Sequence, residues 1–234
     1  MSEKTFNFLE GEVLLIDKPI GWTSFDVVNS IRYTIKRTLN IKKIKVGHAG
    51  TLDPLATGLL IICTGKFTKQ IDSFQGLNKV YIGSMFVGAT TPSFDRETEV
   101  NHTFDTKNIS EEILLDTTKQ FTGEIEQTPP VYSAVKIDGK RAFEYARKNN
   151  EVKIKSRKVT IYNFNLLNFD LPEIDFMVNC SKGTYIRSLV DDFGKAMNNG
   201  AYMSSLRRTA IGNHSVTNAF SLEKIKEIII SQKQ

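Results

Sequence analysis

The stretch Gly-His-Ala-Gly-Thr-Leu-Asp-Pro-Leu-Ala-Thr-Gly at residues 47–58, followed by Leu-Leu-Ile-Ile-Cys at 59–63, decides how this chain folds. The apolar run has the length of a buried strand, and the glycines before it permit a tight loop whose backbone can approach a ligand. Pro54 disfavours a helical conformation at Asp53, so the carboxylate is presented at a defined turn, as reactive groups often are. Asp-Pro is also a common helix start with Asp as the N-cap, and this structural alternative remains open here.

The composition is that of an ordinary globular protein. The chain has 234 residues, with 40% hydrophobic and 24% charged, enough for one large domain or a domain with an appendage. No apolar run has the length of a membrane span, and no secretory signal precedes the first elements. Cys63 and Cys180 lie in strand-like apolar runs and are interpreted as buried free thiols in a reducing compartment. These features predict a cytoplasmic protein without a membrane partner.

Charge is unevenly distributed along the chain. Residues 32–45 contain six basic and no acidic side chains, and residues 136–158 contain nine basic against three acidic. Residues 92–126 have the opposite bias, with nine acidic against three basic. Lysine runs can simply solvate a surface, but two basic clusters together favour binding of a polyanion such as nucleic acid.

Hydrophobic periodicity predicts the main elements. Strands are expected at 12–17, 59–63, 79–88, 159–169, 174–180 and 202–209. Helices are expected at 24–39, with a capping box formed by Thr23 and Asp26, and at 184–197, with Ile186, Leu189, Val190 and Phe193 facing inward. Because strands and helices do not alternate strictly, the fold class is expected to be α+β, with a mixed, mainly antiparallel central sheet flanked by helices and loops.

Several chemistries lack their residue patterns. The three histidines share no metal-ligand spacing with the two cysteines, so a metal site is not expected. Phe67 stands where a phosphate loop needs Ser or Thr, and neither Gly-x-Gly-x-x-Gly nor Gly-x-Ser-x-Gly occurs. These patterns leave carboxylate chemistry without a cofactor, next to basic surface.

Six stretches in the same order resemble the motifs of the tRNA pseudouridine-55 synthases of the TruB type. They are Asp17–Gly21, Gly47–Gly58, Lys79–Tyr81, Gln127–Lys136, Cys180–Arg187 and Leu206–Arg208. The resemblance covers almost the whole chain. It implies a pseudouridine-synthase-like fold that converts a uridine in the T loop of tRNA, position 55, to its C-glycoside isomer without metal or organic cofactor.

The resemblance also implies roles for individual residues. Asp53 corresponds to the nucleophile, which forms a transient covalent bond either with C6 of the base or with C1′ of the sugar. Tyr81 corresponds to the aromatic residue that stacks on the base and can accept the C5 proton, although an ordinary sheet aromatic is the alternative. Arg187 corresponds to the partner that keeps the aspartate ionised.

The remaining site residues follow from the same motifs. Tyr185 and Leu206 would line the pocket, and His48 would fill space around the flipped nucleotide, or else stabilise its loop by a hydrogen bond. Residues 127–158, which include two consecutive prolines and the basic cluster, resemble a thumb that closes over the T-stem loop. Its expected phosphate contacts, which would position the RNA without reading its sequence, are Lys153, Lys155, Arg157 and Lys158.

Two departures from the family pattern stand out. Many bacterial relatives continue into a C-terminal RNA-binding PUA domain, so residues 1–234 are expected to form a single catalytic domain without it, acting as a monomer. The loop 89–95 also lacks the glycine usually found three residues after its aspartate, which leaves the loop conformation open.

Two other functions remain possible from the sequence. One is a catalytically idle tRNA-folding protein of the same fold. The other is a carboxylate-dependent hydrolase, which needs a second carboxylate; Asp191 and Asp192 are the nearest candidates.

Overall fold

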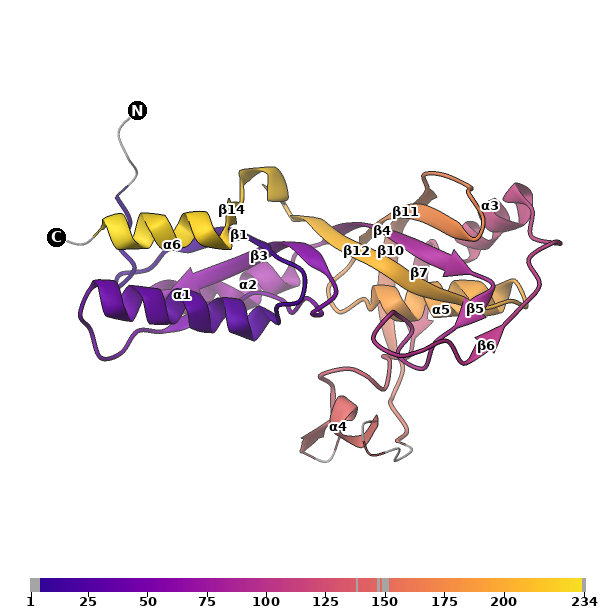
Figure 1. Ribbon diagram of the computed structural model, residues 1–234, viewed down its shortest axis with the longest axis horizontal. Coiled ribbons are helices and arrows are strands. Elements are labelled where there is room, and N and C mark those ends of the chain that lie inside the picture. The colour runs from indigo at the N-terminus through magenta and orange to yellow at the C-terminus, as the bar shows by residue number, and fades with distance from the viewer. Residues whose placement is uncertain (1–4, 138, 147, 149–151, 233–234) are drawn as a thin grey trace. The chain divides into compact units, whose positions relative to one another are not determined.

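The computed structural model describes residues 5–137, 139–146, 148 and 152–232, and its chain divides into two compact units (Figure 1). Unit 1 comprises Met1–Val80 and Arg207–Gln234, and unit 2 comprises Tyr81–Leu206. Strands β4 (Lys79–Val87) and β12 (Ala201–Ile211) each contribute residues to both units. Among the described residues, no helix is long and apolar enough to span a membrane.

Unit 1 is built on the strand that the apolar run predicted. Its elements are β1 (Val13–Lys18), α1 (Ser24–Thr38), β2 (Val46–His48), β3 (Thr57–Thr64), the 3₁₀ helix η1 (Gly65–Gln70), α2 (Ile71–Gly76), β13 (His214–Ser215), the 3₁₀ helix η2 (Val216–Asn218), β14 (Phe220–Ser221) and α6 (Leu222–Ser231). β1 and β2 pair with β3 in antiparallel fashion, whereas residues 207–208 of β12 pair with it in parallel.

Strand β3 is apolar throughout because both of its faces are buried. Leu60 and Ile62 pack in one cluster with residues of α1 and α6, which lie against each other (Figure 1). Leu59, Ile61 and Cys63 point to the other face, where side chains from α2 cover them. Alternate side chains of a strand face opposite sides, so a strand covered on both sides needs an unbroken apolar run.

Helix α1 begins as its sequence predicted. The Thr23 hydroxyl accepts a hydrogen bond from the Asp26 amide at 3.0 Å, and the Asp26 carboxylate accepts one from the Thr23 amide at 3.0 Å. This capping box satisfies two amides that would otherwise lack partners in the first turn. It thereby fixes where the helix starts, directly after the Lys18–Gly21 turn.

Unit 2 contains the remaining elements. Besides its parts of β4 and β12, these are β5 (Ala89–Thr90), β6 (His102–Thr103), α3 (Glu111–Gln120), β7 (Gly123–Gln127), β8 (Lys136–Ile137), β9 (Lys140–Arg141), α4 (Ala142–Ala146), β10 (Arg157–Leu166), β11 (Glu173–Cys180) and α5 (Ile186–Ala196). The main sheet has the order β14-β1-β3-β12-β4-β11-β10-β7. Most of its recorded pairings are antiparallel, which confirms the predicted α+β class with a mixed sheet.

Helix α5 packs its apolar face on the sheet of unit 2. Ile186, Leu189, Val190 and Phe193 are all buried, as the periodicity predicted. Phe193 meets Phe164 of β10 edge to face, with ring centroids 5.4 Å apart. This packing holds the first turn of α5, which carries Arg187.

The short elements β8, β9 and α4 lie apart from the sheet of unit 2 and are joined to it by extended segments (Figure 1). β8 and β9 form a small antiparallel ribbon, and α4 follows directly. Residues 138, 147 and 149–151, which belong to the segment expected to form the thumb, lie outside the described residues.

Candidate active site

Asp53 lies in unit 1, half-buried, on the loop between β2 and β3. The Ala56 amide donates a hydrogen bond to the Asp53 carbonyl at 3.1 Å, which closes a turn over Pro54 and Leu55. β3 then begins at Thr57, so no helix follows and Asp53 is not a helix cap. Proline is favoured at the second position of such a turn, and this explains the Asp-Pro pair without a helix.

The backbone on either side of Asp53 is held by α1 and its preceding turn. The Ser24 hydroxyl donates to the Leu52 carbonyl at 3.1 Å and accepts from the Leu52 amide at 2.8 Å. The Gly21 amide donates to the Pro54 carbonyl at 2.8 Å. A nucleophile gains from such fixed placement because little freedom is left to lose when the reaction geometry forms.

Arg208, which is almost completely buried, donates hydrogen bonds to backbone carbonyls of the same loop and of β3. Its Nε donates to the Leu59 carbonyl at 2.7 Å, and its two terminal nitrogens donate to the carbonyls of Thr51 and Gly50 at 3.4 and 3.1 Å. The sequence motif contains Arg208, but its bracing role was not apparent because its acceptors lie about 150 residues away in the chain. The neighbouring Arg207 instead forms a two-point ion pair with Asp17, at 3.0 and 2.6 Å.

Lys18 is a second buried cation in this region. Its Nζ donates to the carbonyls of Trp22 at 2.6 Å and Pro19 at 2.9 Å, and lies 3.5 Å from the Pro54 carbonyl. Burial is the main reason that the pKa of Lys18 is lowered to about 8; the charge of Asp53 opposes this shift, the charge of Arg208 adds to it, and the charge of Asp26 also opposes it. Lys18 therefore links the turn before α1 to the Asp53 loop.

His48 is the other predicted site residue in unit 1. It is the last residue of β2 and is partly buried. Burial lowers its pKa, the charge of Arg208 lowers it further, and a hydrogen bond with the Gly50 backbone partly offsets both. A neutral imidazole is therefore favoured at neutral pH, which suits packing against a nucleotide better than a charge–charge contact.

Tyr81 and Leu206 come together in unit 2. Tyr81 and Gly83 point to the same face of β4 because they are two residues apart. A Cβ at Gly83 would lie 3.2 Å from Leu206 Cδ1 and would overlap the Ser205 carbonyl oxygen, so glycine is needed for this close approach. Both predicted side chains are largely buried, with 8% of each exposed, and they lie on one face of neighbouring strands.

Arg187 is held by a buried network within unit 2. Its terminal nitrogens donate to the carbonyls of Ser93 at 3.1 Å and Tyr132 at 2.9 Å, and its Nε lies 3.5 Å from Asp95 Oδ2. Both side chains of this ion pair are 3% exposed. Asp95 also accepts hydrogen bonds at Oδ1 from the Ser93 hydroxyl at 2.7 Å and the Glu97 amide at 2.9 Å. No sequence motif predicts that Asp95 is a partner of Arg187.

The network around Ser93 also explains why this loop lacks the glycine that the family pattern places three residues after Asp95. Thr98 occupies its position, and the Thr98 hydroxyl accepts a hydrogen bond from the Ser93 amide at 3.1 Å and lies 2.8 Å from the Ser93 hydroxyl. The residue of this loop with left-handed backbone is Phe94, at φ 63°. Position 98 therefore uses its hydroxyl to organise the loop, and it does not need the freedom of glycine.

Tyr185 and the thumb residue Arg157 also meet in unit 2. The backbone of Tyr185 exchanges hydrogen bonds with the Gln127 side chain at 2.8 and 3.0 Å. Arg157 Cζ lies 4.9 Å from the centroid of the Tyr185 ring, and its Nη2 donates to the Gly183 carbonyl. Lys158 pairs with Glu124 at 2.8 Å, whereas Lys153 and Lys155 are exposed.

The predicted residues are thus divided between the units. His48 and Asp53 belong to unit 1, and Tyr81, Tyr185, Arg187, Leu206 and the four thumb residues belong to unit 2. Asp191 and Asp192 lie on α5 of unit 2, where burial raises the pKa of both carboxyls. Within the described ranges, no group of three or more His, Cys, Asp or Glu side chains could hold a metal ion.

Comparison with known proteins gives the class to which this fold and these residues belong. Residues 36–186 match the family model described as the TruB family pseudouridylate synthase N-terminal domain, and residues 187–234 match that of the tRNA pseudouridylate synthase B C-terminal domain. The chain therefore belongs to the TruB family of pseudouridylate synthases, and the resemblance drawn from the six motifs is confirmed.

Individual relatives agree with this assignment. The tRNA pseudouridine synthase B of Flavobacterium johnsoniae is 56% identical over 221 residues, which cover 94% of this chain and 96% of that protein. The protein of the same name from Phocaeicola vulgatus is 53% identical, covering 97% of each chain. A chain in the crystal structure of a Cbf5-Nop10-Gar1 complex is similar with a TM-score of 0.68 and 29% identity; the match covers 94% of this chain but only 54% of the other.

Proposed function

We propose that this protein isomerises a uridine of tRNA, in the T loop at position 55, to pseudouridine. The observation that carries the proposal is the near full-length match to proteins named tRNA pseudouridine synthase B. Asp53, the expected nucleophile, lies on a turn whose backbone is held by hydrogen bonds from Ser24. The chemistry requires neither a metal nor an organic cofactor.

In the proposed reaction, Asp53 forms a transient bond with the flipped nucleotide, at C6 of the base or C1′ of the ribose. The bond between N1 and C1′ breaks, the base turns, and a bond between C5 and C1′ forms. A carboxylate bound at C1′ leaves as the bond between C5 and C1′ forms, whereas one bound at C6 leaves when C5 loses its proton and the C5–C6 double bond is restored. On either route C5 loses its proton, N1 takes up a proton, and Asp53 returns to its ionised state. Atoms balance without an external reagent, because the product is an isomer of the substrate.

Each remaining residue has a place in this proposal. Tyr81 is proposed to stack on the base while no glycosidic bond holds it, and its hydroxyl is proposed to accept the C5 proton. Arg187, which Asp95 and two carbonyls hold in position, supplies the positive charge that keeps Asp53 ionised. His48, Tyr185 and Leu206 complete the pocket around the flipped nucleotide.

The proposed RNA contact is the basic segment 127–158, which closes over the T-stem loop. Its exposed Lys153 and Lys155 are suited to phosphate contacts, and Arg157 and Lys158 are proposed to exchange their present partners for phosphates. We propose a single catalytic domain that acts as a monomer on tRNA in the bacterial cytoplasm.

The test is release of tritium from tRNA labelled at C5 of uridine. The wild type is expected to release tritium, and Asp53→Asn is expected to lose activity by several orders of magnitude, the scale seen when a covalent nucleophile is removed. The variant should still bind tRNA. Asp72→Asn, which changes an exposed carboxylate on α2, is the matched control and should stay active.

The outcomes separate the alternatives. Normal turnover by Asp53→Asn would remove Asp53 as the nucleophile. Tritium retention by a wild type that binds tRNA would favour the catalytically idle folding protein.

A further inference from the structure

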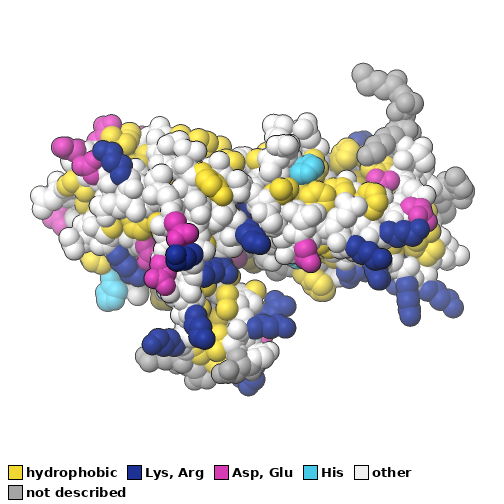
Figure 2. Space-filling view, turned by 180° about the vertical axis from the view of Figure 1, so that it is seen from behind, with side chains coloured by type: hydrophobic (Ala, Val, Ile, Leu, Met, Phe, Trp, Pro, Cys, Tyr) yellow, Lys and Arg dark blue, Asp and Glu magenta, His cyan; other side chains and the backbone are white. Residues whose placement is uncertain are grey.

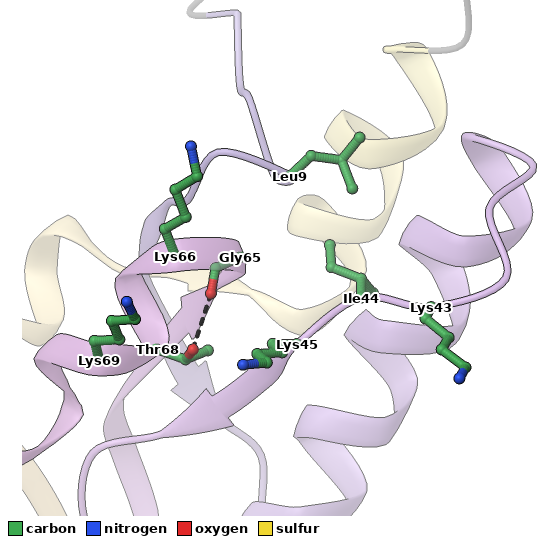
Figure 3. Close-up of a pocket in the computed structure, with 8 residues that line it drawn as sticks. All are labelled: Leu9, Lys43, Ile44, Lys45, Gly65, Lys66, Thr68 and Lys69. Carbon is green, nitrogen blue, oxygen red and sulfur yellow. Dashed lines mark hydrogen bonds between the residues drawn. The ribbon is translucent and has the colours of Figure 1, made fainter.

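Unit 1 contains a basic pocket that the proposed chemistry does not use (Figure 3). It has a volume of ≈ 290 Å³, and four of its lining residues are lysines. These are Lys43 and Lys45, on the segment before β2, and Lys66 and Lys69, on η1. Leu9 and Ile44 supply apolar surface between them.

Backbone hydrogen bonds hold the three segments of this pocket together. The Gly65 amide donates to the Lys45 carbonyl at 2.9 Å, and the Lys66 amide donates to the Glu10 carbonyl at 3.0 Å. Gly65 has φ 52°, and a Cβ at this position would overlap the Leu9 carbonyl. The segments therefore pass close to one another on a fixed backbone, and the lysines project from its rim.

Most of the positive charge in this pocket has no neutralising partner. Lys66 forms an ion pair with Glu10 at 2.5 Å. Lys43, Lys45 and Lys69 are exposed and have no ion pair in the described part of the chain. Lys43 and Lys45 also end the run 32–45, which has six basic and no acidic residues. Figure 2 shows Lys and Arg side chains gathered along one side of unit 1, at the right of that view.

The form of the pocket favours an extended polyanion over a small one. The amides of Gly65 and Lys66, which could otherwise cradle a single phosphate, already donate to the carbonyls of Lys45 and Glu10. The free donors are flexible ammonium groups spread around an open rim. Spaced point charges of this kind neutralise successive phosphates of a nucleic acid backbone without reading its bases.

We propose that this pocket binds the sugar–phosphate backbone of the tRNA substrate at a point outside the loop that carries the target uridine. The proposal rests on the proposed function for the identity of the RNA. Strand β3 runs from the Asp53 loop at Thr57 to the pocket at Thr64. Seven steps of about 3.3 Å place the pocket roughly 23 Å from that loop along the strand. It therefore contacts a part of the tRNA distinct from the flipped nucleotide.

The test compares a triple variant, Lys43→Gln/Lys45→Gln/Lys69→Gln, with the full-length wild type. Binding of unmodified full-length tRNA and of the isolated T-stem loop is measured at several salt concentrations. The control is Lys107→Gln/Lys119→Gln/Lys224→Gln, which removes the same charge from exposed lysines that already face carboxylates.

The pocket variant is expected to bind full-length tRNA about tenfold more weakly at low salt. The slope of log K against log salt should become shallower by about 1 for each lysine, about 3 in all. Turnover at saturating tRNA should stay near wild type, because the pocket lies away from the Asp53 loop. The isolated stem loop then locates the contact: unchanged binding places it beyond the T stem, and weaker binding places it on the stem. The control variant should keep both the affinity and the slope.

An unchanged affinity and slope for full-length tRNA in the pocket variant would overturn the proposal. The proposal would also be overturned if the pocket variant bound tRNA as well as wild type but no longer bound vesicles of anionic phospholipid. The pocket would then bind a membrane surface. Tritium release by the wild type is scored separately. If the wild type releases no tritium while the pocket variant still binds tRNA more weakly, the proposed function is wrong but the pocket is still a tRNA-binding site.

Discussion

Gly58 offers a sharp test of how the Asp53 loop is anchored. It has φ 103° and pairs with Arg208, at the point where β3 and β12 run in parallel. A Cβ at Gly58 would lie 2.8 Å from the Arg208 amide nitrogen and would overlap the Arg208 carbonyl oxygen. Gly58→Ala should therefore separate the two strands and shift the arginine that holds the carbonyls of Gly50 and Thr51.

The expected cost has two parts. Positive φ in a residue with a side chain costs about 1–3 kcal/mol. The overlap with backbone adds roughly 2–4 kcal/mol, from overpacking of about 1–3 kcal/mol and loss of a ladder hydrogen bond of about 1 kcal/mol. Gly123→Ala isolates the first part, because Gly123 has φ 104° and nothing lies within 4 Å of the point that an added Cβ would occupy.

The assay is the free energy of unfolding from urea denaturation, combined with tritium release. Gly58→Ala should lose about 2–4 kcal/mol more stability than Gly123→Ala, and its midpoint of thermal unfolding should be about 4–16 °C lower. Gly21→Ala, with φ 80° and open space around it, serves as a control in unit 1. Turnover should fall for Gly58→Ala. Equal destabilisation of all three variants would refute the argument from close strand approach.

Two further variants probe the buried charges. Asp95→Asn should lower the free energy of unfolding by about 3–5 kcal/mol and reduce turnover, because it leaves the buried Arg187 guanidinium without its carboxylate. Glu99→Gln, an exposed position on the same loop, is the control. If Asp95→Asn kept wild-type turnover and stability, Asp95 would not position Arg187. Burial and the charge of Asp191 raise the pKa of Asp192 from 3.8 to about 6, whereas Lys195 opposes the shift. The folded state thus keeps a proton between about pH 4 and 6 that the unfolded state loses, and this group's contribution to stability falls as pH rises through that window. In urea denaturation, Asp192→Asn should be about 1–3 kcal/mol more stable than wild type at pH 7.5 and nearly as stable as wild type at pH 4. An equal difference in stability at pH 7.5 and pH 4 would show that Asp192 does not have a raised pKa.

Local patterns were sufficient for the elements that carry the site. The capping box marked the start of α1, and the apolar run marked β3, because both signals depend on residues adjacent in the chain or on one side-chain period. The periodicity around Phe193 likewise identified the buried face of α5. The order of the motifs was enough to indicate the family, which the comparisons confirmed.

The choice between a helix cap and a turn at Asp53 required the tertiary structure. The bond from the Ala56 amide to the Asp53 carbonyl and the start of β3 at Thr57 show that it is a turn. Ser24, Lys18 and Arg208 hold this turn in place and reach the loop from 28 to 158 residues away in the chain. No local spacing records such hydrogen bonds, because they exist only after the strands of unit 1 have paired. The partnership of Asp95 with Arg187 was missed for the same reason, since the two are far apart in sequence and meet in a buried ion pair.

The sequence by itself determined the fold class, the family and the residue types available for chemistry, since these follow from periodicity and motif order. The tertiary structure decided which buried cations hold the Asp53 loop, why Thr98 replaces a glycine, and which lysines line one pocket. Each of these depends on side chains and carbonyls brought together by strand pairing and core packing, and their energies exist only in the folded chain.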